Sequence, residues 1–270
     1  MKICVVAPVN DDAILERDLL RSPPIVDGLP LSIMRGYKSA ASAYNAALKQ
    51  VSADLAVFVH QDVYLPSGWV ELVQQRIAEV DLIDPNWAVL GLFGATASGN
   101  HVGRLWCGAA ERELGSKLSA PQPVVSIDEV LIILRLGSGL RFDEGLPGFH
   151  LYGTDIAQIA LAQQRGVYVI DAPVVHNTKK PGSLRGAYFK AFRYMAGKWR
   201  KRLPIPTVVV SLTRWGAKMY IRELKVFKNQ MLQPRKVDIT KKTDPADIAR
   251  QFGYEWPSNE GGFGSNLRKI

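Results

Sequence analysis

The stretch LAVFVHQD, residues Leu55–Asp62, decides how this chain folds. Its first five residues are an uninterrupted apolar run with β-branched side chains, which is typical of a parallel strand buried on both faces. The polar triplet His-Gln-Asp then ends the strand. Ile3–Val9 (ICVVAPV) has the same character and is followed by the polar pair Asn-Asp at 10–11. The sequence therefore predicts two buried strands with polar groups at their carboxyl ends.

Helical and strand patterns alternate outward from these two strands. Further strands are predicted at Leu29–Met34, Ala88–Phe93, Val124–Leu136 (one strand or a pair) and Val167–Ile170. Helices are predicted at Ala13–Leu20, Ser39–Gln50, Trp69–Val80 and Thr154–Arg165, the last with Thr154 or Asp155 as its N-cap. The Gly-rich segment Ser98–Leu118 fits neither pattern. This alternation predicts an α/β fold with a mostly parallel sheet flanked by helices.

The composition excludes several classes of protein. Of the 270 residues, 47% are apolar and 22% are charged, which is globular composition rather than that of a disordered or fibrous chain. No apolar run reaches the roughly 18–20 residues that span a bilayer. Cys4 and Cys107 are the two cysteines, so we expect a reduced, cytoplasmic protein. The sequence has no P-loop, no dinucleotide-binding glycine motif after a strand and no G-x-S-x-G motif of a serine hydrolase.

The net charge of +9 is unevenly distributed. Lys179–Lys236 holds 16 basic residues and one acid, Glu223, so this segment carries +15, whereas the rest, with 18 bases and 24 acids, carries −6. Aromatic residues lie among the basic ones, and helices are predicted at Leu184–Arg200 and about Val208–Gln230. The stripe of Phe189, Phe192, Met195 and Trp199 favours packing against the sheet. The charge is either a solvated surface or a surface for an anionic partner: a nucleotide diphosphate, an anionic lipid or a nucleic acid.

Polar side chains gather at the predicted carboxyl ends of the strands, where α/β sheets bind ligands. Asp62 and His60 follow one strand, and His176 follows another. A carboxylate and imidazoles at one sheet edge suit a divalent cation, which would bridge the phosphates of a nucleotide-sugar. The alternative is that both histidines are ordinary loop residues.

Asp155 lies at a predicted helix start, where the helix dipole favours the ionised carboxylate. Such a carboxylate can accept the proton of an attacking sugar hydroxyl. The alternative is a plain N-cap, and the residues alone leave both open.

Two longer stretches carry a resemblance to a known family. The run ASAYNAALKQVSADLAVFVHQDVYLPSGW (Ala41–Trp69) resembles the Asn-containing helix, strand and DXD region of family 2 glycosyltransferases. The run LRFDEGLPGFHLYGTDIAQIALAQQRGVYVIDAPVVH (Leu140–His176) resembles the second signature of that family. HQDV followed by FHLYGTD is closer to the subgroup called glycosyltransferase-like family 2. The resemblance covers about residues 3–180 and implies a GT-A fold, which is Rossmann-like.

The resemblance also implies roles for individual residues. Asp62 matches the last Asp of the DXD motif and His176 a histidine of the metal site, whereas His60 stands where the first Asp usually stands. Asp155 matches the general base, and Thr154 replaces the usual Glu before it. The residues implied to contact the donor are Pro8, Val9, Asn10, Asp11, Lys38, Asn45, Gln61, Asp62 and Asp128. Those implied to face the acceptor are His150, Tyr152, Gly153 and Thr154.

Together, these observations predict an inverting glycosyltransferase that moves a sugar from a nucleoside-diphosphate sugar, expected to be a UDP-sugar, to a hydroxyl of a glycan, lipid-linked or protein acceptor. Mn²⁺ or Mg²⁺ is the expected cofactor. We expect a catalytic, nucleotide-sugar-binding domain over residues 1–180, a basic, aromatic helical extension over 181–236, and a tail over 237–270 packed on or near the active site.

Two other functions stay open at this point. The first is a catalytically degenerate protein that binds sugar nucleotides without turnover, which His60 and Thr154 would explain. The second is a nucleic-acid-binding module built on the basic helices, although no zinc spacing or RNA-binding signature supports it and no nucleic-acid partner is expected. For the enzyme, we expect a cytoplasmic location, and the basic amphipathic helices raise the further hypothesis of peripheral contact with the anionic inner face of a membrane.

Overall fold

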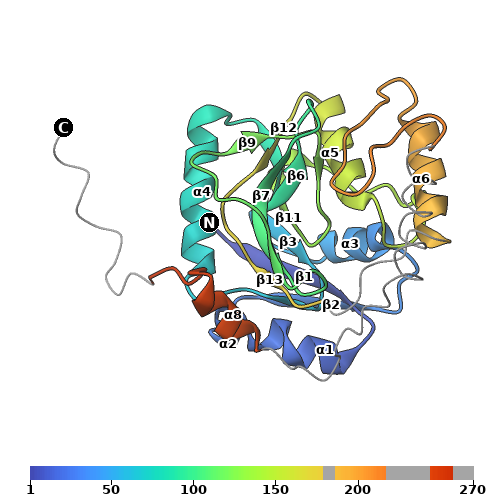
Figure 1. Ribbon diagram of the computed structural model, residues 1–270. Helices are drawn as coiled ribbons and strands as arrows, with labels where there is room; N and C mark the ends of the chain where they lie inside the picture. Colours follow the sequence, from blue (N-terminus) through green and yellow to red (C-terminus); the bar gives the residue numbers. More distant parts are fainter. Residues whose placement is uncertain (179–185, 217–243, 258–270) are drawn as a thin grey trace, which may run out of the picture.

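The computed structural model describes residues 1–178, 186–216 and 244–257. These residues form an α/β arrangement in which helices cover both faces of a central sheet (Figure 1). Figure 1 shows α4 on one side of this sheet and α3, α5 and α6 on the other. The α/β fold class predicted from the alternation of strands and helices is confirmed.

The central sheet has seven strands in the described part of the chain, in the order β2-β1-β3-β11-β5-β12-β9. Their bounds are β1 Ile3–Val9, β2 Leu31–Arg35, β3 Leu55–Val59, β5 Trp87–Gly91, β9 Gln122–Pro123, β11 Leu131–Arg135 and β12 Gly166–Val169. β2, β1, β3, β5 and β12 run in one direction, because β11 is antiparallel to both β3 and β5. β9 pairs antiparallel with β12. The predicted direction therefore holds for five strands, while β11 and β9 are reversed.

The alternation of side chains along the central strands builds two cores. On β3, Ala56 and Phe58 enter the core under α3, α5 and α6, whereas Leu55, Val57 and Val59 enter the core under α1 and α4. None of these five side chains is more than 1% exposed to solvent. Because successive side chains of a strand point to opposite faces, a strand covered by helices on both sides must be apolar at every position. This requirement explains the uninterrupted run LAVFV.

The helices are short, and α1, α3, α4, α5 and α6 bury apolar side chains in the two cores, whereas α2 has no buried residue. Their bounds are α1 Asp12–Arg17, α2 Pro23–Val26, α3 Ala40–Leu48, α4 Trp69–Ile83, α5 Tyr152–Ala162, α6 Ala187–Lys198 and α8 Pro245–Gln251, with 3-10 turns at Leu19–Arg21 and Leu136–Ser138. Ser39 caps α3 by accepting from the backbone N–H of Ser42, and Asp11 caps α1 by accepting from Ile14.

A second, smaller sheet carries part of the candidate site. Its order is β10-β6-β7-β13-β4, with β8 paired to β7. The bounds are β4 Val63–Tyr64, β6 Phe93–Ala95, β7 His101–Cys107, β8 Arg112–Gly115, β10 Ser126–Ile127 and β13 Val175–His176. The Gly-rich segment left unassigned by sequence pattern is thus the β7–β8 hairpin. Gly103 has a φ of +91°, and a Cβ there would lie 2.0 Å from the carbonyl oxygen of Leu92, so only glycine fits.

The start of α5 differs from its prediction. The helix begins at Tyr152, with Leu151 as its N-cap at a φ of +64°, so Thr154 and Asp155 lie inside the first turn and neither is the N-cap. The local sequence offered two capping side chains, but the backbone N–H of Asp155 already bonds to the carbonyl of Leu151. Asp155 therefore lies within the hydrogen-bonded first turn of α5 and does not cap the helix.

Parts of the two C-terminal segments are described. In α6, Phe192 and Met195 are buried in the core with α5, and Phe189 and Trp199 are partly buried against it, which confirms that this stripe packs. α8 packs against β4 and β13 through Ile248. Most of the second predicted basic helix, residues 217–230, lies outside the described residues. Among the residues that are described, no helix combines the length and apolar character needed to cross a bilayer.

We predict that Leu90→Ala lowers the free energy of unfolding by about 2–5 kcal/mol, because Leu90 on β5 is fully buried and truncation leaves a cavity. Leu82→Ala on α4 is the matched control: Leu82 is 88% exposed, so its loss should change stability by less than about 0.5 kcal/mol. Urea unfolding measures both. Equal effects of the two substitutions would contradict the assignment of the core.

Candidate functional site

A cavity of about 430 Å³ opens at the carboxyl ends of β1, β2 and β3. Its lining residues are Pro8, Val9, Asn10, Met34, Gly36, Tyr37, His60, Gln61, Asp62 and Phe149. This is the edge at which α/β sheets bind ligands, and the volume lies in the range of small-molecule sites. Six residues expected to contact the donor or the metal line it: Pro8, Val9, Asn10, His60, Gln61 and Asp62.

Gln61 ties the ends of β1 and β3 together. Its side-chain oxygen accepts from the backbone N–H groups of Asn10 and Asp11, at 2.9 and 3.2 Å, and its amide nitrogen donates to Asn10 Oδ1 at 2.8 Å. These bonds hold one wall of the cavity in a fixed shape. Gln61 therefore lines the cavity and also fixes Asn10, another lining residue.

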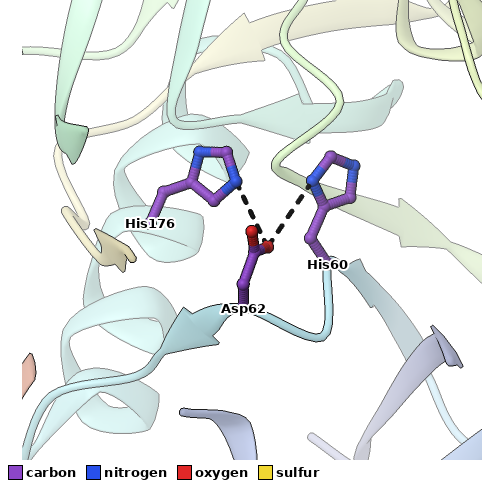
Figure 2. Close-up of side chains that lie close together, drawn as sticks. All are labelled: His60, Asp62 and His176. Carbon is purple, nitrogen blue, oxygen red and sulfur yellow. Dashed lines mark ion pairs between the residues drawn. The ribbon is translucent and has the colours of Figure 1, made fainter. Parts of the chain in front are cut away.

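His60, Asp62 and His176 form the one group in the described residues that could hold a metal ion. One ligand atom from each lies within 4.8 Å of the other two. Figure 2 shows the carboxylate between the two imidazole rings. Asp62 Oδ1 is 3.2 Å from His176 Nε2 and 4.0 Å from His60 Nδ1. The predicted convergence of these three residues is thus what the structure shows.

Backbone bonds bring His176 to Asp62 across more than a hundred residues. β13 pairs antiparallel with β4, which places His176 opposite Val63. The backbone N–H of Asn177 then donates to the carbonyl of Asp62 at 2.8 Å. The Asn177 amide also donates to Asp18 Oδ1 at 2.7 Å, and Asp18 is fully buried. The strand end that carries His176 is therefore fixed from two sides.

The charges of the three side chains depend on one another. Burial disfavours the charged form of Asp62, but the attraction of His176, His60 and a hydrogen bond from His176 outweigh it and hold the pKa of Asp62 far below its usual range. Burial opposes charge on His176 too, yet the nearby Asp62 carboxylate raises its pKa. Burial lowers the pKa of His60. The site thus contains an ionised carboxylate beside one imidazole that favours its neutral form.

The ring nitrogen of His60 that faces away from Asp62, Nε2, contacts Tyr152 of α5. His60 Nε2 lies 2.9 Å from the hydroxyl of Tyr152, and that hydroxyl donates to the backbone carbonyl of Glu129 at 3.0 Å. Tyr152 is only 2% exposed and packs among Tyr44 and Phe142. A side chain with this burial does not face an acceptor in this structure, although the sequence resemblance implied that it would.

The other residues expected at the acceptor or the reaction centre lie in the first turn of α5, except His150, which precedes the helix. Gly153 and Thr154 are buried, while His150 is half-buried with its ring 5.4 Å from that of Tyr188. Asp155 is 1% exposed. Its carboxylate accepts from Lys198 Nζ at 2.8 Å and from Trp199 Nε1 at 2.7 Å, so it ties α6 to α5. Burial raises the pKa of Asp155, and the bond from Lys198 offsets only part of that effect.

The remaining residues expected at the donor do not line the cavity. Asn45 is 7% exposed, and its amide bonds to the backbone of Phe142 and to Glu144, so it holds that loop. Lys38 is exposed on the loop that follows the lining residue Tyr37. Asp11 caps α1.

Asp128 and Glu129 lie on the loop beside His60, Asp62 and His176, the three residues called the metal group from here on. Asp128 is partly exposed, its carboxylate accepts from the N–H of Val130, and its charge adds to that of Asp62 in raising the pKa of His176. Sequence reasoning did not select Glu129. Burial and the neighbouring Asp128 raise its pKa to about 8, against a bond from the N–H of Leu151 that lowers it. The one available signal was its position next to Asp128.

Comparisons with known proteins give distant similarities. No protein family profile matches the chain. A Fuscovulum blasticum protein described as "ATP synthase subunits region ORF 6" is 25% identical over 173 residues, which span 60% of this chain and 66% of that protein, just under two thirds of its length.

Several structural neighbours that cover most of the chain are described as a mannosyltransferase, TarS or glucosyl-3-phosphoglycerate synthase. A Pyrobaculum calidifontis mannosyltransferase in complex with GDP-Man and Mn²⁺ is 12% identical, with a TM-score of 0.44, over 93% of this chain and 79% of that one. Glucosyl-3-phosphoglycerate synthase from Mycobacterium tuberculosis is 19% identical, with a TM-score of 0.47, over 77% and 81%. S. aureus TarS 1-349 with UDP-GlcNAc is 14% identical, with a TM-score of 0.45, over 90% and 76%. At these scores the function has to be argued from the site itself.

The raised pKa of Glu129 predicts a pH dependence of stability. Between the ordinary pKa of 4.5 and about 8, the folded protein keeps a proton on Glu129 that the unfolded chain has lost. The folded state then binds more protons, so the free energy of unfolding falls as pH rises through this window, by about 1.4 kcal/mol for each unit of pKa difference. Glu129→Gln retains an acceptor for Leu151 but cannot titrate.

Urea unfolding at pH 5, 6, 7 and 8 checks this prediction. Groups common to both proteins cancel in the comparison, so the stability of Glu129→Gln relative to the unchanged protein should increase with pH. Curves that stay parallel over the whole range would show that Glu129 titrates normally.

Proposed function

We propose that this chain is a glycosyltransferase of family 2 that binds a nucleoside-diphosphate sugar. The observation that carries the proposal is that the cavity and the metal group share His60 and Asp62. A ligand in the cavity therefore has a cation site at its side. A nucleoside fits against Pro8–Asn10, and its diphosphate reaches the group of His60, Asp62 and His176.

The three donor atoms suit a divalent cation. Mg²⁺ prefers oxygen ligands and near-ideal octahedral geometry, whereas first-row transition ions, Mn²⁺ among them, also accept imidazole nitrogen, and this set has two imidazole nitrogens and one carboxylate oxygen. When bound there, a divalent cation would supply Lewis-acid stabilisation of the departing diphosphate. Of the two cofactors expected from the sequence, we therefore propose Mn²⁺ rather than Mg²⁺.

The reaction that follows is attack of an acceptor hydroxyl on the anomeric carbon, from the face opposite the diphosphate, with inversion. A UDP-sugar is the proposed donor, and a glycan or lipid-linked acceptor is the proposed partner. Asp155 is the proposed general base from the family resemblance. In this structure, however, its carboxylate is held by Lys198 and Trp199, so it must exchange at least one of these partners to accept a proton.

The contacts of Asp155 favour one second candidate, a protein that binds sugar nucleotides without turnover. A buried, ion-paired Asp155 beside a buried Thr154 leaves the helix end with no free carboxylate of its own. Binding through Asp62 and the cavity does not require that base. Both candidates therefore bind the nucleotide-sugar, and only the enzyme transfers or hydrolyses the sugar.

A panel of UDP-, GDP- and TDP-sugars with and without Mn²⁺ tests binding. We expect one donor class to raise the melting temperature by several degrees with Mn²⁺ and by less without it, because ligand at about 100 times its Kd adds about 2.7 kcal/mol. Asp62→Asn should remove the Mn²⁺-dependent part and keep the fold. Slow hydrolysis of the stabilising donor supports the enzyme, and stabilisation without hydrolysis supports the binding protein. No stabilisation by any donor would refute both.

Asp155→Asn should lower kcat by about 10²–10⁴-fold and leave donor binding unchanged, if Asp155 is the general base. Lys198→Met is the matched control, because it breaks the same ion pair from the other side and keeps the carboxylate. Steady-state kinetics on both variants, with thermal unfolding to confirm folding, separates the roles. An equal loss of rate in the two variants would show that the pair anchors α6 and that Asp155 is not the base.

A further inference from the structure

The hydroxyl of Tyr152 stands between a group that can only accept a hydrogen bond and the metal group. On one side the backbone carbonyl of Glu129 lies 3.0 Å away, and on the other His60 Nε2 lies 2.9 Å away. A carbonyl oxygen cannot donate, so the single hydroxyl proton of Tyr152 goes to Glu129. The hydroxyl oxygen then accepts from its other neighbours.

This assignment fixes the proton on His60. Nε2 faces an oxygen whose own proton is already used, so the contact is favourable when Nε2 carries a hydrogen and donates it. Neutral imidazole has one N–H, and Nδ1 is then left with its lone pair. Nδ1 is the atom that faces Asp62, at 4.0 Å from Oδ1 (Figure 2). The ring therefore presents a lone pair to the place where a cation would bind.

Tyr152 is rigidly held in this position. It is 2% exposed, and its ring packs edge-on against that of Tyr44, with centroids 5.5 Å apart. The Tyr44 hydroxyl donates to the Tyr152 hydroxyl at 3.5 Å, a longer and weaker contact that adds a second donor to the same oxygen. Neither tyrosine lines the cavity, so neither contacts a ligand that occupies it.

We propose that Tyr152 is a positioning residue that holds His60 in the tautomer competent to bind a divalent cation. The proposal deepens the proposed function, since it concerns the metal group of that same site. It reassigns Tyr152 from the acceptor to the support of a metal ligand. Partners of this kind, bonded to the outer nitrogen of a histidine ligand, typically change metal affinity about 10–100-fold when lost.

The first test reads the tautomer directly in protein free of metal and donor. With ¹⁵N-labelled histidine at pH 8, where an ordinary imidazole is neutral, long-range ¹H–¹⁵N correlation distinguishes the protonated ring nitrogen from the other. The chain has four histidines, and His60→Asn assigns the signal. We expect the proton on Nε2 of His60, and a mixture of tautomers in Tyr152→Phe. A proton on Nδ1 in the unchanged protein would overturn the proposal.

The second test measures Mn²⁺ binding by calorimetry. Tyr152→Phe should weaken it about 10–100-fold, whereas Tyr44→Phe, a loss of one hydroxyl from the same buried cluster, should change it by less than about threefold. Unchanged affinity in Tyr152→Phe, or an equal loss in Tyr44→Phe, would refute the positioning role. If the unchanged protein binds no Mn²⁺, the proposed metal site fails, and the tautomer measurement alone decides the assignment of Tyr152.

Discussion

The site depends on one backbone hydrogen bond, from the N–H of Asn177 to the carbonyl of Asp62 at 2.8 Å. Together with the pairing of β13 and β4, it holds His176 next to Asp62, the residue that precedes β4. Without that closure, Asp62 and His60 would be two loop residues after a strand. With it, a carboxylate lies between two imidazoles. The metal group is therefore a property of how the small sheet joins the large one.

The same closure explains why buried polar groups surround the site. Asp18 is fully buried, yet it is ionically paired with Arg17 and accepts from the amide of Asn177. A buried carboxylate left without such partners would be costly, and with them it anchors the strand end. Outside the metal group, Ile248 of α8 and Tyr254, which follows this helix, form a buried cluster with Tyr64 of β4 and Val175 of β13. The described part of the C-terminal region thus supports the strands that position His176.

Sequence patterns anticipated the elements with strong periodicity and missed what long-range contacts decide. β1 and β3 were placed to the residue, because a strand covered on both faces must be apolar throughout. The reversal of β11 and the β7–β8 hairpin were missed, since strand direction is set by partners far away in the chain. The grouping of His60, Asp62 and His176 followed from the rule that ligands bind at carboxyl ends of strands. The burial of Asp155 under Lys198 and Trp199, and of Tyr152 among Tyr44 and Phe142, could not be foreseen, because both depend on contacts between distant parts of the chain.

A site with one carboxylate differs electrostatically from one with two. The side chains of His60, Asp62 and His176 offer a divalent cation a single negative charge, so the bound cation would retain about one positive charge. Such an ion is held less tightly by the protein alone, but it attracts a diphosphate more strongly than a neutralised ion does. For the proposed function, metal and donor affinities would then be coupled, and by linkage each would increase the other by the same factor. In that proposal, His60 in place of an acid favours a cation that arrives and leaves with its nucleotide over one that is permanently bound.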